Sequence, residues 1–504
     1  MANPTVVLVP VWGVGHFVPM LTAGKRLLAA SGGSGGRPTL TLTVLIMPAP
    51  TARLASEIAE HIRRVEQDAA SAGLGVRFLY LPAEPPPPPD GGAGAGYSGS
   101  EEFISLSMQQ YAPHVRAAIA GLACPVAAVV IDIFCTPLLD AARGLGVPAY
   151  VYLICSAAHV ALMLRAPALD DEAAAGAQFE GEVHVPGLPP VPPSCLPTGL
   201  VDRTIPAYKW FVYNGRRYME AAGLIVNTVA ELEPRVLAAI ADGQCTRGVR
   251  PPPVYTVGPV HADFTPPEQE QGEHECVRWL HAQPPASVVF LCFGSGRFFT
   301  AQQAGEAAVA LERSGRRFLW VLRGQPARGE SLSTDVDDLA AMLPAGFLER
   351  TKHRGLVWPR WAPQREILAH AAVGCFVTHC GWNSALESLS SGVPMLPWPW
   401  GAEQHYNAFM LAAAVGAAVR VEVDRSRDSF VEAAELERAI ATLFGDDGEE
   451  GRKARETALE TKAACRKAAE DGGSSWASLR RLCDALHQGA VAVLPSQLLQ
   501  DSEV

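Results

Sequence analysis

The first half of the chain alternates short apolar runs with longer segments that mix apolar and polar residues. Apolar or β-branched runs predict buried strands at residues 5–11, 40–46, 76–81, 126–131, 149–154 and 223–227. Helical spacing of the apolar residues predicts helices at residues 16–28, 55–70, 103–119, 138–145 and 205–222. Strands that alternate with helices indicate a parallel sheet, because parallel neighbours need a long crossover connection.

The second half repeats this alternation. Its apolar runs predict strands at residues 287–293, 317–322, 355–358, 375–379 and 417–421. Its last part predicts helices at residues 433–443, 453–468 and 475–487. We therefore expect an α/β protein with two doubly wound, Rossmann-like domains that face a cleft, with ligands beyond the carboxyl ends of the strands.

Length and punctuation suggest the domain limits. A chain of 504 residues is too long for one hydrophobic core. Residues 251–275 mix Pro, Gly and acidic residues, which predicts a linker. We expect an N-terminal domain over residues 1–250 and a C-terminal domain over residues 276–474. A closing helix and a tail would occupy residues 475–504.

Composition excludes several classes of protein. The net charge of −11 argues against nucleic acid as a partner, because phosphate backbones attract an excess of Lys and Arg. The eleven cysteines are dispersed and form no C-x-x-C pair, which favours reduced thiols. No basic leader precedes the first apolar run, and no apolar stretch has the ~18 residues of a membrane span. We expect a cytoplasmic monomer with no membrane span.

The most informative stretch begins with the apolar run at residues 375–379. Cys380 and Gly381 follow as a turn, and a helix is predicted from Trp382 to the Gly-Val-Pro stop at residues 392–394. A helix N-terminus presents unpaired N–H groups, and Gly381 allows close approach of the backbone, so this arrangement suits a phosphate. Glu387 lies one turn beyond Asn383 and Ser384 and can accept hydrogen bonds from sugar hydroxyls.

Residues 361–404, from WAPQ through HCGWNS to the closing EQ, closely resemble the plant secondary-product glycosyltransferase box. This box is the signature of family 1 UDP-dependent glycosyltransferases of small plant metabolites. The resemblance implies the GT-B fold, with the last helix packed back on the first domain. It also implies that Trp361 stacks on uracil and that Glu387 holds the ribose hydroxyls. The other implied donor contacts are Ala362 and Gln364 at base and ribose, His379, Asn383 and Ser384 at the diphosphate, and Trp382, Glu403 and Gln404 at the sugar.

Two further features bear on the donor. In the family, Gln at the last position of the box usually accompanies UDP-glucose and His accompanies UDP-galactose, so Gln404 favours glucose. Ser295 lies in a Gly-Ser-Gly turn after the first strand of the second half, where a hydroxyl and backbone N–H groups can reach the diphosphate. Ser156 follows the strand at residues 149–154, where the family has a Ser or Thr that reaches the sugar. The bulky Arg297-Phe298-Phe299 sequence after the Gly-Ser-Gly turn departs from the smaller residues often found in the family.

The acceptor must lose a proton, and His16 is the best-placed base. It lies between the first strand and the first helix, whose N-terminus disfavours imidazolium. Asp132 ends another strand of the same half and can fix the tautomer of His16. The stretches GVGHFVP and VVIDIFC match the catalytic His and Asp segments of the family. We expect attack opposite the UDP, with inversion at the anomeric carbon.

The partners would be UDP-glucose, as a co-substrate, and a small phenolic acceptor such as a flavonoid. The acceptor would contact first-half loops near Trp12 and at residues 82–100 and 186–197. The D-x-D sequence at residues 335–337 reads as a solvated acidic cap, so no metal and no cofactor are expected. UDP-galactose use and C-glycosylation remain alternatives within the family. A nicotinamide-dependent dehydrogenase and a non-catalytic binder of nucleotide sugars are the alternatives outside it.

Overall fold

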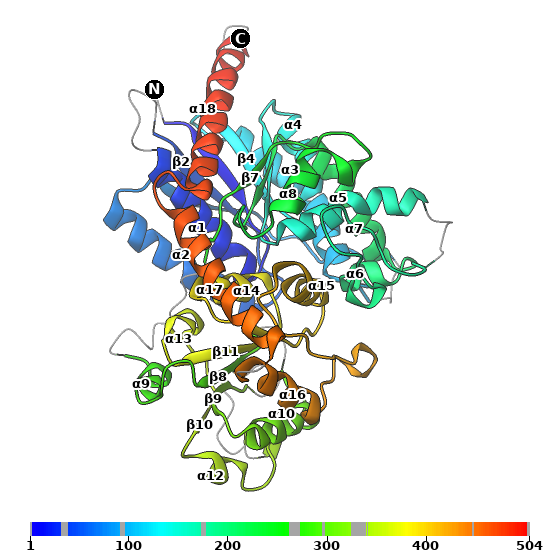
Figure 1. Cartoon of the computed structure of the whole chain (residues 1–504). Coiled ribbons are helices and arrows are strands. Elements are labelled where there is room, and N and C mark those ends of the chain that lie inside the picture. Colours follow the sequence, from blue (N-terminus) through cyan, green and yellow to red (C-terminus); the bar gives the residue numbers. More distant parts are fainter. Residues whose placement is uncertain are drawn as a thin grey trace. The chain divides into compact units, whose positions relative to one another are not determined.

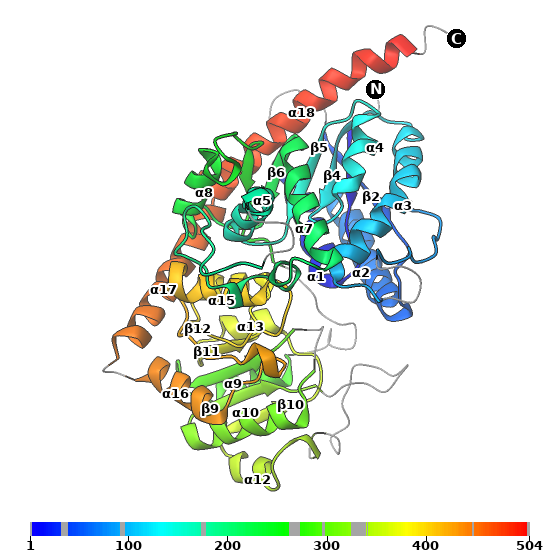
Figure 2. The ribbon, with the colours of Figure 1, turned by 90° about the vertical axis from the view of Figure 1, so that its right-hand side faces the viewer.

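The computed structural model describes residues 3–31, 39–90, 96–172, 178–261, 273–294, 298–323, 339, 341–445 and 448–500 (Figures 1 and 2). The chain divides into two compact units. Unit 1 comprises Met1–Pro190, Thr198–Ala262 and Lys467–Val504, and unit 2 comprises Val191–Pro197 and Asp263–Arg466. The main division thus falls inside the segment that the sequence predicts as the linker.

Unit 1 contains a parallel sheet of seven strands in the order β3-β2-β1-β4-β5-β6-β7. Their bounds are β1 (Thr5–Val9), β2 (Thr41–Ile46), β3 (Val76–Tyr80), β4 (Val126–Asp132), β5 (Ala149–Leu153), β6 (Gly223–Val226) and β7 (Val254–Thr256). Strands β1 and β4 are buried along their whole length, as the apolar runs Val6–Val9 and Val126–Ile131 within them require. Strand β7 lies inside the predicted linker. The sequence did not indicate this strand, because three residues after a run of prolines give no periodic signal.

Helices flank this sheet. They are α1 (Val14–Ser31), α2 (Ala52–Ala72), α3 (Ser100–Ala120), α4 (Leu139–Arg143), α5 (Ala157–Glu172), α6 (Thr198–Val201), α7 (Pro206–Arg217), α8 (Pro234–Ala241) and α18 (Ser474–Gln500). Helix α5 has no counterpart in the sequence prediction. It is apolar on nearly every side, and a helix of this kind is buried in the interior rather than amphipathic.

The C-terminal helix α18 belongs to unit 1 and lies along it in both views (Figures 1 and 2). Leu482 and Leu486 are buried in the same core cluster as residues of β1 and α1. The Sγ atom of Cys483 lies 3.7 Å from the carbonyl oxygen of Leu27 in α1. The last helix therefore packs on the N-terminal sheet, as the resemblance implied.

Unit 2 contains a parallel sheet of five strands in the order β10-β9-β8-β11-β12. The strands are β8 (Val288–Cys292), β9 (Arg317–Val321), β10 (Gly355–Trp358), β11 (Val373–Thr378) and β12 (Met395–Pro397). The strand predicted at residues 417–421 is reduced to an isolated bridge between Met395 and Ala418. Strand β12 is the edge strand instead. The sequence did not predict it, because prolines lie before it and at its end, and proline is unfavourable within strands.

The helices of unit 2 are α9 (Glu275–His281), α10 (Ala301–Ser314), α12 (Phe347–Thr351), α13 (Gln364–Ala369), α14 (Trp382–Ser391), α15 (Gln404–Met410) and α16 (Ala433–Phe444). Helix α17 (Glu449–Ala469) runs from unit 2 into the segment assigned to unit 1. Phe299, which departs from the family pattern, packs into an aromatic core with Phe293, Trp320, Trp398 and Trp400. Its bulk therefore serves the interior of unit 2.

A short segment from the first half of the sequence, Val191–Pro197, belongs to unit 2. It forms a turn of 3-10 helix at Pro193–Cys195. The guanidinium of Arg425 donates to the carbonyl oxygens of Ser194 and Leu196, at 2.8 and 2.9 Å. The sequence suggested only an unstructured Pro-rich loop here, because the partner that fixes the segment lies more than two hundred residues away.

Two helical glycines give a matched test of packing. A Cβ at Gly215 in α7 would lie 2.2 Å from the carbonyl oxygen of Met163 in α5, whereas a Cβ at Gly305 in α10 would meet nothing within 4 Å. We expect Gly215→Ala to lower the free energy of unfolding by about 1–3 kcal/mol, because backbone must move. Gly305→Ala should raise it by up to about 1 kcal/mol through helix propensity. Urea unfolding of both variants tests the pair, and equal effects would contradict the packing described.

Candidate active site

The sheet of unit 1 brings His16 and Asp132 together. Strand β4 ends at Asp132, and β1 is followed by a turn in which Gly13 has a φ of 103°, before His16 in the first turn of α1. Strands β1 and β4 are parallel neighbours, with Val9 opposite Ile131. Both side chains therefore stand at the carboxyl edge of the sheet, where ligands of such sheets bind.

The contact between these side chains fixes the imidazole. Nδ1 of His16 lies 3.0 Å from Oδ1 and 3.1 Å from Oδ2 of Asp132. The Asp132 side chain is fully buried, whereas that of His16 is 27% exposed. A carboxylate only accepts hydrogen bonds, so Nδ1 of the neutral ring carries the proton and Nε2 carries the lone pair. The pair can thus act as a base that is oriented by a buried carboxylate.

In unit 2, β11, the three residues His379–Gly381 and α14 form the predicted strand–turn–helix site. Cys380 adopts a left-handed φ of 62°, and Nδ2 of Asn407 donates to its carbonyl oxygen at 2.9 Å. Helix α14 then begins at Trp382, directly after Gly381. The first N–H groups of α14 have no intrahelical partner and follow a turn that Asn407 fixes, so they suit an anion.

The imidazole of His379 fills the space between two glycines. A Cβ at Gly294 would lie 2.9 Å from Nε2 of His379, and a Cβ at Gly381 would lie 2.6 Å from the same atom. Any other residue at either glycine would displace the ring. Burial lowers the pKa of His379 to about 4, so the ring is neutral at pH 7. It can therefore approach a diphosphate as a hydrogen-bond donor and not as a counter-charge.

Three predicted donor residues converge on one point. Nε2 of Gln364, the first residue of α13, donates to Oγ of Ser384 at 2.9 Å and to Oε2 of Glu387 at 2.7 Å. Ser384 and Glu387 are both buried on α14. Trp361 is half-buried, Ala362 is buried beside it, and Nε1 of Trp358 donates to the carbonyl oxygen of Trp361 at 2.9 Å. The box thus folds into one polar patch beside an aromatic side chain.

The end of the box forms a second turn. Oε1 of Gln404 accepts from the backbone N–H groups of Trp400 and Gly401, at 2.8 and 3.3 Å. Glu403 precedes α15 as its N-cap residue. Because the turn uses the amide oxygen of Gln404, the side chain presents its amide nitrogen as a hydrogen-bond donor. Trp382 is 3% exposed, so its indole belongs to the core and its backbone N–H is the group suited to a ligand.

The structure brings other predicted residues to different roles. Ser156 is fully buried, and its Oγ accepts from the backbone N–H of His159, so it caps α5. Ser295 and the acidic residues 335–337 lie outside the described residues.

Within the described ranges, no group of three or more His, Cys, Asp or Glu side chains is arranged to hold a metal. The helices of the described chain include none that is long and apolar enough to cross a membrane.

Sequence reasoning missed one buried carboxylate near this edge. Glu233 accepts hydrogen bonds at 2.8 Å from the backbone N–H groups of Ala157 and Ala158, the first residues of α5, and also from Oγ1 of Thr228. Burial raises the pKa of Glu233, and these three donors offset only part of that rise. The residue ties the segment after β6 to the segment after β5. Nothing in the sequence signals this role, because the partners lie far apart along the chain.

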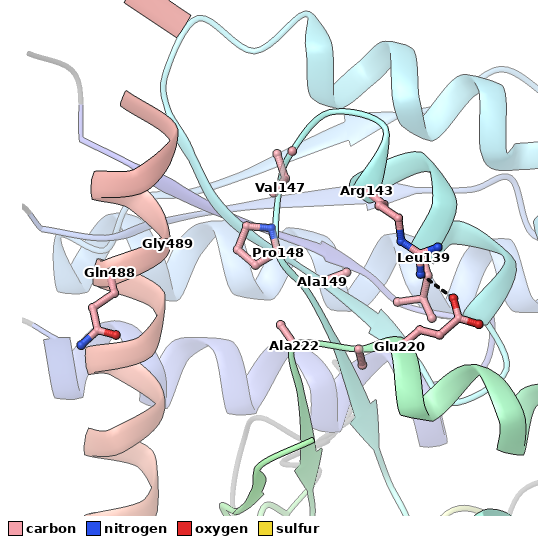
Figure 3. A pocket seen from close by; sticks show the side chains of 11 residues that line it. Leu139, Arg143, Val147, Pro148, Ala149, Glu220, Ala222, Gln488 and Gly489 are labelled. Atoms are coloured by element: carbon pink, nitrogen blue, oxygen red, sulfur yellow. Dashed lines mark hydrogen bonds and ion pairs between the residues drawn. The ribbon is translucent and has the colours of Figure 1, made fainter. Parts of the chain in front are cut away.

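A pocket of unit 1 lies elsewhere (Figure 3). Its volume is about 530 Å³, and it is bounded by Val147 and Pro148 before β5, by Ala222 before β6 and by Gln488 in α18. An ion pair between Arg143 and Glu220 crosses part of its wall. The pocket sits at the amino ends of the strands, the edge opposite Asp132. It is therefore separate from the site that contains the His–Asp pair.

Two parallel α/β sheets, a helix start suited to phosphate and a His–Asp pair at a strand edge define an enzyme of the nucleotide-binding α/β class. The family model for UDP-glucoronosyl and UDP-glucosyl transferases matches residues 252–448. With the relatives described next, this match shows that the chain belongs to the plant family 1 UDP-glycosyltransferases.

The relatives match along nearly the whole chain. A malvidin galactosylase of Oryza sativa subsp. japonica is 58% identical over 499 residues, which cover 98% of this chain and 100% of that protein. An anthocyanidin 5,3-O-glucosyltransferase of a Rosa hybrid cultivar is 35% identical, with coverage of 97% and 100%. A solved structure of Phytolacca americana UGT2, complexed with UDP-2fluoro-glucose and pterostilbene, is 32% identical with a TM-score of 0.79, covering 96% and 100%.

These likenesses confirm the predicted family, the GT-B fold and glycosyl transfer as the class of enzyme activity. They favour a glycosyltransferase over both a nicotinamide-dependent dehydrogenase and a non-catalytic binder. The donor sugar, the catalytic pair and the individual donor contacts stay predictions, which the geometry described above makes specific.

The contact between Gln364 and Glu387 yields a test of the donor site. Gln364→Glu would place a second carboxylate at the position that now lies 2.7 Å from Glu387. We expect UDP affinity at pH 8 to fall about tenfold, because two adjacent carboxylates resist sharing a site. The affinity should recover as the pH falls, because one carboxyl of the pair then takes up a proton.

Gln364→Ala is the matched control, because it removes the donor without adding charge. Its loss of affinity should show no such recovery when UDP binding is followed by calorimetry between pH 8 and pH 5.5. Identical pH profiles of the two variants would contradict the convergence of Gln364 and Glu387 at the donor site.

Proposed function

We propose that this enzyme transfers glucose from UDP-glucose to a hydroxyl of a flavonoid-like phenol, with inversion at the anomeric carbon. The observation that carries the proposal is the 3.0 Å contact between His16 and the buried Asp132, at the sheet edge where substrates bind. The family supplies the donor class, and the pair supplies a base for the acceptor. We further propose a cytoplasmic monomer that needs no metal, and the eleven cysteines, which form no disulfides in the described chain, support that location.

The proposed step is a single displacement. The acceptor hydroxyl gives its proton to Nε2 of His16 while its oxygen attacks the anomeric carbon from the face opposite the UDP. The bond from that carbon to the diphosphate oxygen breaks, and its electron pair leaves with UDP. Asp132 stabilises the imidazolium that forms, and the N-terminus of α14 with neutral His379 stabilises the charge that develops on the diphosphate.

Anthocyanidins are the acceptors that the relatives suggest. One relative is named a malvidin galactosylase and another an anthocyanidin glucosyltransferase. Both names describe sugar transfer to planar polyphenols, whose hydroxyls ionise readily enough for an imidazole to serve as the base. We propose this class of acceptor for the present chain, through an O-glycosidic bond. A product whose sugar survives acid hydrolysis would instead indicate C-glycosylation.

UDP-galactose is the second candidate donor. The amide of Gln404 supports glucose, whereas the relative that is 58% identical along the chain is named a galactosylase. Turnover of malvidin and of other anthocyanidins with each donor separately, and with both in competition, distinguishes the two. A higher kcat/KM with UDP-galactose would replace glucose in the proposal and leave its mechanism unchanged.

Removal of the base gives the first test of the mechanism. His16→Ala should lower kcat by about 10²–10⁴-fold, the usual contribution of a general base. The affinity for UDP should stay near that of the wild type, because the donor residues lie on unit 2. Steady-state kinetics with calorimetry of UDP binding measures both. A variant with near-normal kcat would exclude His16 as the base.

The second test concerns the tautomer of His16. Asp132→Asn keeps the shape of the side chain but lets an amide N–H point at Nδ1, which moves the ring proton to Nε2. We expect kcat to fall about 10²-fold or more, with the melting temperature nearly unchanged. Asp140→Asn, an exposed acid on α4 that is paired with Arg143 and Arg217, serves as the control and should keep full activity.

A further inference from the structure

His274 lies directly before α9 and beside the indole of Trp361, which is proposed to stack on the uracil of the donor. Its Nδ1 accepts the backbone N–H of Cys276 at 3.1 Å, so the side chain caps the helix. The same ring stands edge-on to two indoles. Its centroid is 5.2 Å from that of Trp358 at an interplanar angle of 72°, and 6.4 Å from that of Trp361 at 82°.

These contacts restrain Trp361 in two ways. Trp358, buried at the end of β10, holds the backbone of Trp361 through the hydrogen bond to its carbonyl oxygen. His274 contacts the ring of Trp361 itself. Helix α9 positions His274, and β10 positions Trp358. Two regular elements therefore fix the indole of Trp361, which itself lies on the loop between β10 and α13.

The charge state of His274 agrees with this packing role. Burial lowers the pKa of His274, and the nearby guanidinium groups of Arg360 and Arg278 lower it further against the opposing effects of Glu275 and the Trp361 backbone. The ring is therefore neutral at pH 7, with Nδ1 as the acceptor and the proton on Nε2. A neutral ring makes an aromatic edge contact whose preferred geometry is directional.

We propose that His274 is a positioning residue that holds the indole of Trp361 in the orientation that receives the uracil of the donor. The proposal rests on the proposed role of Trp361. A pre-oriented indole loses less side-chain freedom when a base stacks on it, so the effect appears in nucleotide affinity. The role is distinct from capping, because capping needs only an acceptor atom whereas positioning needs the ring.

Two substitutions separate these roles. His274→Asn keeps an oxygen that can accept the N–H of Cys276 but removes the ring, and His274→Phe keeps a ring but removes the acceptor. We expect Asn to raise the Kd for UDP about fivefold with the melting temperature preserved. This loss of affinity is smaller than the loss expected when uracil has no aromatic side chain to stack on. Phe should keep the Kd within about twofold of the wild type and lower the melting temperature.

His281→Asn is the matched control. His281 ends the same helix, is 54% exposed and pairs with Glu273 and His370. This substitution should leave the Kd for UDP unchanged. Trp361→Ala provides the reference for complete loss of the platform, and His274→Asn should have no further effect in that background. Isothermal calorimetry with UDP on the full chain measures all five variants.

The outcomes separate this inference from the proposed function. If the wild type binds UDP and Trp361→Ala weakens binding, but His274→Asn matches the wild type, the positioning role is overturned and the proposed function stands. It is also overturned if His274→Asn costs the same affinity with and without Trp361, or if Phe weakens binding as much as Asn. If the wild type does not bind UDP, or Trp361→Ala binds it unchanged, the proposed donor site itself fails.

Discussion

The hydrogen bond between His16 and Asp132 depends on the parallel pairing of β1 with β4. A fully buried carboxylate is costly unless donors surround it, and the imidazole supplies one of them. Two buried tyrosines hold the backbone close to each partner. Tyr152 donates to the carbonyl oxygen of Pro19, one turn after His16, and Tyr218 donates to that of Ile133, directly after Asp132. The geometry of the proposed base is thus fixed by the core of unit 1.

Unit 2 repeats the strand–turn–helix construction for a different purpose. In unit 1 the turn after β1 leads to the proposed base, whereas in unit 2 the turn after β11 leads to backbone N–H groups that are proposed to bind the diphosphate. The ring of His379 is neutral because it is buried, and two glycines leave the space that it fills. Glycine loses more conformational entropy on folding than other residues, and in return its missing Cβ lets a ligand approach the backbone closely. Each unit therefore presents its proposed functional groups at the carboxyl edge of its sheet. Unit 1 presents a proton acceptor there, and unit 2 presents hydrogen-bond donors for an anion.

Much of this arrangement could be predicted, since edge positions follow from strand ends. The apolar runs of β1, β4 and β11 placed His16, Asp132 and His379 at sheet edges, and the ordered box placed Gln364, Ser384 and Glu387 together. Strands β7 and β12 escaped, because short strands beside prolines carry no periodicity. Helix α5 escaped because a helix buried on all sides has no polar face. Ser156 has a role that the sequence did not indicate, because the cap that its side chain forms depends on where α5 begins.

The sequence by itself determined the class of fold, the family resemblance and the two residues of the proposed base, because strand-forming runs and short motifs are local. Tertiary structure alone decided which distant groups meet. It placed Glu233 at the start of α5, the carbonyls of Val191–Pro197 against Arg425, and the ring of His274 against Trp361. Such contacts join residues separated by tens to hundreds of positions. Their partners are selected by packing and by the need to satisfy buried polar groups, neither of which leaves a pattern along the chain.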